Sequence, residues 1–268
     1  MSELRLSAIN VYPIKSAAGL PQSAWEVDSF GLRHDRRWML VDEAGDFLSQ
    51  RTHPRLALIR PELRSAALVL RASGRADLEL PFAAPAGPEV VVTVWGGETR
   101  GESVAEDADR WIAELVGVAC RLVHMPEHVV RPVGADYAFD GERTSFTDGF
   151  PFLLISEASL ADLNARLATP VPMNRFRPNL VVAGSEPFAE DGWRRIRIGP
   201  VAFRVAKRCP RCVTTTVDQA TGAPQGPEPL RTLATFRRNG EGQVDFGQNL
   251  LHAGTGRLEV GMPVQILD

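Results

Sequence analysis

The sequence has little cysteine, no long apolar run and no excess of either charge. Three cysteines among 268 residues are too few, and odd in number, for a disulfide framework, which favours a reducing compartment. No apolar run approaches the ~20 residues that a membrane-spanning helix needs, and the first residues lack the basic and apolar regions of a signal peptide. A net charge of −3 gives no general attraction to nucleic acid or acidic membranes. We therefore expect a cytoplasmic protein that binds neither nucleic acid nor a membrane.

Short apolar segments separated by Gly, Pro or Asp fill the N-terminal part of the chain. Hydrophobic residues make up 44% and charged residues 24%, as in globular proteins that bury a full core. Many short strands with such punctuation indicate a barrel or sandwich rather than a parallel α/β sheet. The sequence therefore predicts a mixed, β-rich fold that begins with a β-barrel-like module. Its strands are expected at residues 4–12, 38–41, 47–49, 56–60, 68–71, 78–82 and 90–95.

One amphipathic helix is expected between two modules. Residues 104–116 carry apolar side chains at helical spacing, and Ser103 with Glu106 has the sequence pattern of a capping box. Such a helix buries one face, so we place the module boundary near its end. The predicted modules span residues 1–120 and 121–268.

The C-terminal module is expected to contain more short strands and two helices. Ser156 is expected to cap a helix over residues 157–167, and another helix begins near Pro229. Residues 126–147 show no period and are predicted to form a long loop, a feature that is usually functional or disordered. Further strands are expected at residues 152–155, 180–183, 196–198, 201–205, 258–260 and 264–267.

Two of the cysteines form a C-x-x-C motif, Cys209-Pro210-Arg211-Cys212, among basic residues. Nearby positive charge favours the thiolate, which is a nucleophile, a redox centre or a soft-metal ligand. Structural zinc needs four ligands, and neither Cys120 nor a histidine pair lies close in sequence. A thioredoxin-like site needs a helix after the motif, whereas the β-branched run 213–217 predicts a strand. A reactive thiol and an unreactive buried cysteine both stay open at this point.

Basic residues near strand ends indicate an anion site. Arg177 precedes Pro178, which is expected to hold it in an extended conformation and so to aim its guanidinium. Guanidinium groups fixed in this way suit bidentate phosphate contacts, although solvated arginines at a strand edge show the same pattern. Together with a reactive thiol, Lys15, Arg36 and Arg177 would form a site for a phosphate-bearing cofactor whose metal takes a cysteine ligand.

Seven short segments form an ordered set along the chain, at residues 11–16, 35–38, 51–56, 155–164, 176–179, 189–193 and 211–222. This set resembles the MOSC-domain proteins, with an N-terminal MOSC β-barrel domain before the MOSC domain. The group that it resembles most contains the mitochondrial amidoxime-reducing component and its bacterial YcbX-like relatives. Each segment by itself has low specificity for the family, but the resemblance extends in order over nearly the whole chain.

The resemblance implies a β-rich fold with a few peripheral helices and a molybdenum cofactor, a pterin dithiolene with a terminal phosphate. Cys212 matches the metal ligand, and Cys209 matches a neighbouring cysteine that is not a ligand. Asp191 matches an acidic residue near the metal and is the expected proton donor. The residues expected to hold the pterin or its phosphate, or to complete the pocket, are Lys15, Ser16, Arg36, Asp148, Gly149, Arg177, Asn179, Pro210 and Arg211.

The function implied is the reduction of N-hydroxylated or N-oxygenated small molecules such as amidoximes, hydroxylamines and N-hydroxylated bases. The chain lacks the ferredoxin extension of some bacterial relatives, so electrons are expected from a separate flavin or iron–sulfur protein. Two alternatives stay open. One is a sulfur-transfer protein that carries a persulfide on Cys212, and the other is a non-enzymatic carrier of the cofactor.

Overall fold

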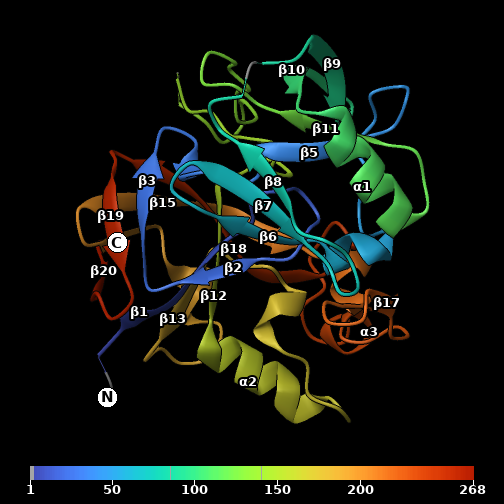
Figure 1. Cartoon of the computed structure of the whole chain (residues 1–268). Helices are drawn as coiled ribbons and strands as arrows, with labels where there is room; N and C mark the ends of the chain where they lie inside the picture. The colour runs from blue at the N-terminus through green and yellow to red at the C-terminus, as the bar shows by residue number, and fades with distance from the viewer. Residues whose placement is uncertain (1–2, 85, 140) are drawn as a thin grey trace.

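The computed structural model describes residues 3–84, 86–139 and 141–268, and it is rich in strands (Figure 1). Within these residues the strands form several sheets, and three α-helices lie at the periphery. The expected mixed, β-rich fold with a few peripheral helices is confirmed. None of the helices in the described part of the chain is long and apolar enough to cross a membrane.

An eight-stranded sheet is the largest element of the fold, and it combines strands from both ends of the chain. Its order is β2-β1-β13-β12-β18-β15-β14-β20, and the pair β12 and β13 is parallel whereas the other pairs are antiparallel. Figure 1 shows the blue N-terminal strands beside strands from the C-terminal half. The strands are β1 (Arg5–Val11), β2 (Leu20–Gln22), β12 (Phe152–Ser156), β13 (Leu180–Ala183), β14 (Arg195–Ile198), β15 (Val201–Pro210), β18 (Asp245–Ala253) and β20 (Val264–Ile266).

Smaller sheets build most of the N-terminal half. A four-stranded sheet has the order β5-β11-β10-β9, and a three-stranded sheet has the order β6-β7-β8. A further sheet, β19-β3-β4, again joins the two ends of the chain, and β16 pairs with β17. The bounds are β3 (Ala24–Asp28), β4 (Gly31–Leu32), β5 (Trp38–Val41), β6 (Arg60–Leu63), β7 (Ala67–Arg71), β8 (Leu78–Pro81), β9 (Glu89–Val94), β10 (Gly97–Ser103), β11 (Arg121–His124), β16 (Val217–Asp218), β17 (Ala223–Pro224) and β19 (Gly256–Glu259). The module boundary near residue 120 stays a prediction.

All three α-helices lie where the sequence predicts them, but the predicted N-cap of the first helix is wrong. Helix α1 (Glu106–Val116) begins after Ala105, and no side chain caps it, so the expected capping box of Ser103 and Glu106 is wrong. Ser103 instead continues β10, where it pairs with Val123. Helix α2 (Glu157–Arg166) is capped as expected, because Ser156 Oγ accepts a hydrogen bond of 3.0 Å from the Ser159 backbone N–H. Helix α3 (Leu230–Leu233) begins after Pro229, as predicted, but is short.

Two predicted strands are 3₁₀-helices instead. The β-branched run after the C-x-x-C motif forms η4 (Val213–Thr216), because the hydroxyls of Thr215 and Thr216 donate to the carbonyls of Cys212 and Val213 at 3.0 and 2.8 Å. Such local bonds offer the backbone an alternative to the hydrogen bonds of a strand ladder. The predicted strand at 56–60 falls mostly in η1 (Pro54–Leu58), which has proline in its first turn.

The sheets pack on several apolar clusters. One cluster fills the large sheet and includes Leu154, Leu180 and Leu250, all fully buried. A second cluster lies between α1 and the N-terminal sheets and includes Leu68 and Ile112. The loop at residues 126–147 has little regular structure, as expected, within its described residues. These clusters fix the strand ends that carry the site.

Shortening Leu250 should destabilise the fold most clearly, because this residue is fully buried in β18 between Phe152 and Val205. We expect Leu250→Ala to lower the free energy of unfolding by about 3 kcal/mol. The matched control, Val91→Ala at an exposed position of strand β9, should change it by less than about 0.5 kcal/mol. Urea denaturation monitored by circular dichroism measures both, and equal losses in the two variants would contradict the assignment of β18 as a central strand.

Candidate functional site

A cavity of about 500 Å³ lies where the two halves of the chain meet. Cys212 and every residue expected to hold the cofactor line it, whereas Asp191 does not. These residues come from separate loops and strand ends, so the fold brings together segments that are far apart in sequence. The expected residues on the cavity wall are Lys15, Ser16, Arg36, Asp148, Gly149, Arg177, Asn179, Pro210, Arg211 and Cys212.

Cys212 stands between the end of β15 and the start of η4, and a buried arginine holds this segment in place. The Arg175 side chain is 4% exposed, and its guanidinium donates to the Thr216 carbonyl at 2.9 Å. It also bonds Asp218 at 3.1 Å and Gln225 at 2.7 Å. Its Nε has no hydrogen-bond partner, but Arg175 does not line the cavity, so it serves to position the Cys212 segment rather than to bind a ligand.

The basic residue within the C-x-x-C motif contacts the first cysteine rather than the second. Arg211 approaches Cys209 Sγ at 2.9 Å and donates to the Phe176 carbonyl at 2.6 Å. Exclusion of water nevertheless raises the pKa of Cys209, and Arg211 only partly opposes this effect. Cys212 Sγ lies 3.4 Å from Thr214 Oγ1. The expected stabilisation of a thiolate by neighbouring positive charge therefore does not outweigh burial at Cys209.

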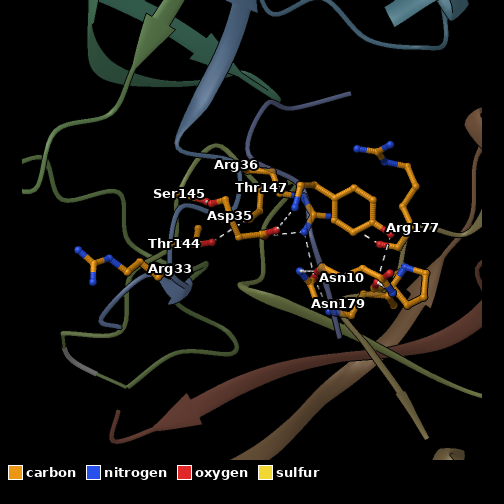
Figure 2. Close-up of polar contacts among 12 residues, drawn as sticks. Asn10, Arg33, Asp35, Arg36, Thr144, Ser145, Thr147, Arg177 and Asn179 are labelled. Carbon is orange, nitrogen blue, oxygen red and sulfur yellow. Dashed lines mark hydrogen bonds and ion pairs between the residues drawn. The ribbon is translucent and has the colours of Figure 1, made fainter. Parts of the chain in front are cut away.

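Arg36 joins the two halves of the chain at the cavity wall (Figure 2). Its guanidinium bonds Asp35 at 2.5 Å and the side-chain oxygen of Asn179 at 3.0 Å. Asn179 in turn donates to the carbonyl of Asn10 at 3.2 Å. Figure 2 shows Asp35, Arg36 and Asn179 side by side, so the guanidinium is fixed from both halves. A fixed guanidinium is pre-organised for an anion.

The ring of Tyr12 contacts two guanidinium groups of the cavity. Arg36 Cζ is 4.3 Å and Arg177 Cζ is 4.4 Å from its ring centroid. Burial raises the pKa of Tyr12 to about 12, although both arginines oppose the shift. Burial also lowers the pKa of Arg177 to about 10, which still leaves it charged at neutral pH. The tyrosine is thus a neutral spacer that holds two charged groups at the cavity.

The backbone is strained at three cavity residues. Ser16, Arg36 and Arg177 have φ angles of 68°, 48° and 57°, in the left-handed region that residues other than glycine rarely adopt. The expected extended conformation of Arg177 is therefore wrong. Arg177 is instead held by a 2.6 Å bond to the Ala17 carbonyl. Such strain persists only where surrounding contacts over-determine it, and it is common at functional sites.

Lys15 and Asp148 form an ion pair on the cavity wall. The Lys15 side chain is 6% exposed, and burial lowers its pKa while Asp148 partly offsets that shift. Trp95 Nε1 also donates to Asp148 Oδ1, at 2.9 Å. Asp148 is positioned by the preceding loop, in which Ser145 donates to the Asp35 carbonyl at 2.7 Å. The long loop is thus tied to the residues around Arg36.

Several cavity residues were absent from the sequence prediction. Phe47 and Trp95 come from the N-terminal half, where the sequence indicates only strands, and Lys207 lies near the end of β15. Arg51 belongs to one of the motif segments but had no assigned role. The Trp95-Gly96-Gly97 turn is the one available sequence signal, because a large aromatic residue in a tight turn is unusual.

Asp191, the expected proton donor, is paired with other side chains. It lies in η3 (Ala189–Gly192), where Arg237 bonds both carboxylate oxygens at 2.7 and 3.0 Å. Gln248 donates to it at 2.7 Å, and Arg208 lies 3.3 Å away. These partners occupy both carboxylate oxygens, and Asp191 does not line the cavity. The structure therefore gives no support to a proton-donor role at the cavity for Asp191.

The charged groups and thiols of the cavity fit an anionic cofactor in which the cofactor itself supplies most of the metal ligands. Among the described lining residues, six are basic and one is acidic, namely Lys15, Arg36, Arg51, Arg177, Lys207 and Arg211 against Asp148. No group of three potential metal-ligating side chains occurs in the described part of the chain. The buried Nε of Arg211 also has no hydrogen-bond partner. Two thiols, those of Cys209 and Cys212, among several cations fit a molybdenum cofactor better than a metal ion held by protein ligands alone.

Two domain families match the chain. The family described as MOSC N-terminal beta barrel domain matches residues 3–119, and the MOSC domain family matches residues 141–265. Mitochondrial amidoxime-reducing component 1 of Mus musculus is 38% identical, over 96% of this chain and 80% of that protein. The Homo sapiens protein of the same name is 36% identical, over 96% and 81%. The molybdenum cofactor sulfurase of Oryza sativa subsp. japonica is 33% identical, over 92% of this chain and 32% of its own length.

The thiols should differ in their reactivity in the cofactor-free protein. Burial raises the pKa of Cys120 to about 11 and also raises that of Cys209, so these two groups hold little thiolate at pH 8. We expect iodoacetamide to label Cys212 first, as measured by mass spectrometry of peptides over time. The fast phase should vanish in Cys212→Ser and persist in Cys120→Ser. Faster labelling of Cys209 than of Cys212 would contradict this order.

Proposed function

The chain belongs to the MOSC-domain family, and from this premise we propose that it is a molybdenum-cofactor-dependent reductase of N-hydroxylated small molecules. The observation that carries the proposal is the thiol of Cys212 on a cavity that fixed cations and a second thiol, that of Cys209, also line. Similarity to amidoxime-reducing components over nearly the whole chain supports the choice of reaction. Electrons would come from a separate flavin or iron–sulfur protein.

The residues have distinct roles in this proposal. Cys212 would supply the protein's sulfur ligand to molybdenum, and its position is set by Arg175 beneath η4. Arg36 and Arg177, held at fixed distances by Tyr12, would neutralise the cofactor's phosphate. The polar groups of Ser16 and Asn179 and the backbone of the loop at Gly149 and the turn at Pro210–Arg211 would complete the cofactor pocket.

When bound, the cofactor supplies the two-electron reduction that converts an N–OH group to N–H with release of water. The chain's own residues hold the reacting groups together and set the charge around them. The outer end of the cavity is open to solvent, since the Asp148 side chain is 72% exposed and Trp95 is 44% exposed. Water can therefore bring the two protons that the reaction consumes, with no need for Asp191.

Replacing the thiol tests the proposal directly. We expect Cys212→Ser to lower the rate of benzamidoxime reduction, with reduced viologen as the electron donor, by at least about 100-fold. Changing a group that only supports a metal ligand typically costs less than this. Its molybdenum content should fall while its circular dichroism spectrum stays unchanged. Cys120→Ser is the matched control, because this cysteine lies far from the cavity lining, and it should keep both activity and molybdenum. Full activity with stoichiometric molybdenum in Cys212→Ser would refute the proposal.

A sulfur-transfer protein is the second candidate, because the sulfurase of Oryza sativa subsp. japonica aligns with nearly the whole chain. In that case Cys212 of the wild-type protein would carry a persulfide, seen as an added sulfur in its mass, and activity would not need bound molybdenum. A cofactor carrier would bind molybdenum tightly and reduce no N-hydroxylated compound, even with reduced viologen. The same preparations therefore distinguish all three functions.

A further inference from the structure

Phe47, Arg51 and Trp95 form an aromatic wall on the N-terminal side of the cavity, which we call the Trp95 wall. The rings of Phe47 and Trp95 meet edge to face, with centroids 4.9 Å apart. The guanidinium of Arg51 lies 4.2 Å from the Trp95 ring centroid. Trp95 is 44% exposed, so part of its ring surface is free for contact with a ligand.

Trp95 is held in a strained position by these contacts. It follows β9 in the hairpin turn to β10, with a φ of 53°, an unusual value for a bulky residue. Its indole N–H bonds Asp148, which pairs with Lys15 deeper in the cavity. Lys15 Nζ also lies 4.9 Å from the Phe47 ring centroid. The Trp95 wall is thus fixed to the residues proposed to hold the cofactor.

A second aromatic and basic group borders the same cavity from the C-terminal half. Phe150 and Lys207 line it, and Tyr137 packs edge to face on Phe150 with centroids 5.5 Å apart. Lys207 Nζ lies 4.8 Å from the Tyr137 ring and 5.7 Å from the Phe150 ring. Both halves of the chain therefore contribute aromatic surface and positive charge to one cavity.

We infer that the outer end of this cavity is the substrate site, that it takes flat aromatic N-hydroxylated compounds without positive charge, and that Trp95 determines this specificity. The inference rests on the proposed reductase function. Aromatic side chains favour a flat aromatic substrate through stacked and edge-to-face contacts. Arg51 and Lys207 disfavour cationic substrates. An amidoxime is neutral at pH 7 whereas its amidine product is protonated, so the same charges also favour product release.

Two amidoximes of different shape test the inference on the cofactor-loaded protein, again with reduced viologen. We expect Trp95→Ala to lower kcat/KM for benzamidoxime about tenfold and to change that for acetamidoxime, which has no ring, less than twofold. Trp95→Phe keeps an aromatic face but lacks the bond to Asp148, and it should keep benzamidoxime reduction within about threefold. Without reductant, calorimetry should show the same tenfold loss of benzamidoxime affinity in Trp95→Ala.

Trp111→Ala is the matched control variant. Trp111 also has an arginine near its ring, at 5.2 Å, and its indole N–H is also bonded, but it lies on α1 away from the cavity lining. This variant should leave the ratio of the two substrates unchanged. Each variant is compared at equal molybdenum content, so that loss of cofactor is not mistaken for loss of specificity.

The outcomes separate the inference from the function on which it rests. Equal losses for both amidoximes in Trp95→Ala, or a Trp95→Phe variant as poor as Trp95→Ala, would overturn the inference and assign Trp95 to support of Asp148. Reduction of neither amidoxime by fully loaded wild-type protein would overturn the proposed function itself. In that event the calorimetric comparison still decides whether the Trp95 wall selects an aromatic ring.

Discussion

The site depends on two guanidinium groups that both contact the ring of one buried tyrosine, Tyr12. Arg36 and Arg177 repel each other, and both lose hydration in the cavity wall. Asp35 and Asn179 offset this cost at Arg36, and the Ala17 carbonyl does so at Arg177. The offset is incomplete, because the cavity has one carboxylate against six basic groups among its described lining residues. This remaining positive charge is what makes an anionic ligand the natural occupant.

The same two residues carry backbone strain. The Arg36 and Arg177 backbones lie in the left-handed region, at a cost of about 1–3 kcal/mol each. The large sheet can carry this cost because β1, β12 and β13 bury apolar side chains on the strands next to these residues. Strand β1 comes from the N-terminal end, so the two halves of the chain cannot separate without dismantling the anion site.

The sequence predicts an element or side-chain position well where residues close in sequence determine it, and poorly where contacts between distant segments determine it. The apolar runs of β12 and β13 and the Ser156 cap are local signals and are confirmed. Strand β18 has no apolar period, since polar Asp245, Gln248 and Asn249 interrupt it, so only its pairing with β12 and β15 reveals it. The extended conformation of Arg177 is predicted from its neighbour Pro178, and the role of Asp191 from the family resemblance. Tertiary contacts, to Ala17 and to Arg237, decide both instead.

A chain of polar contacts connects the outer end of the cavity with its buried end. Trp95 bonds Asp148, Asp148 pairs with Lys15, and the Lys15 backbone N–H bonds the Trp38 carbonyl at 2.8 Å. The Arg36 carbonyl accepts from the Phe146 N–H at 3.0 Å, so the loop that carries Asp148 is tied to the anion site as well. Asp148 is therefore shared by the region proposed for the substrate and the region proposed for the cofactor. A carboxylate in this position lets each region influence the geometry of the other, because neither Trp95 nor Lys15 can move without losing its bond to the shared group.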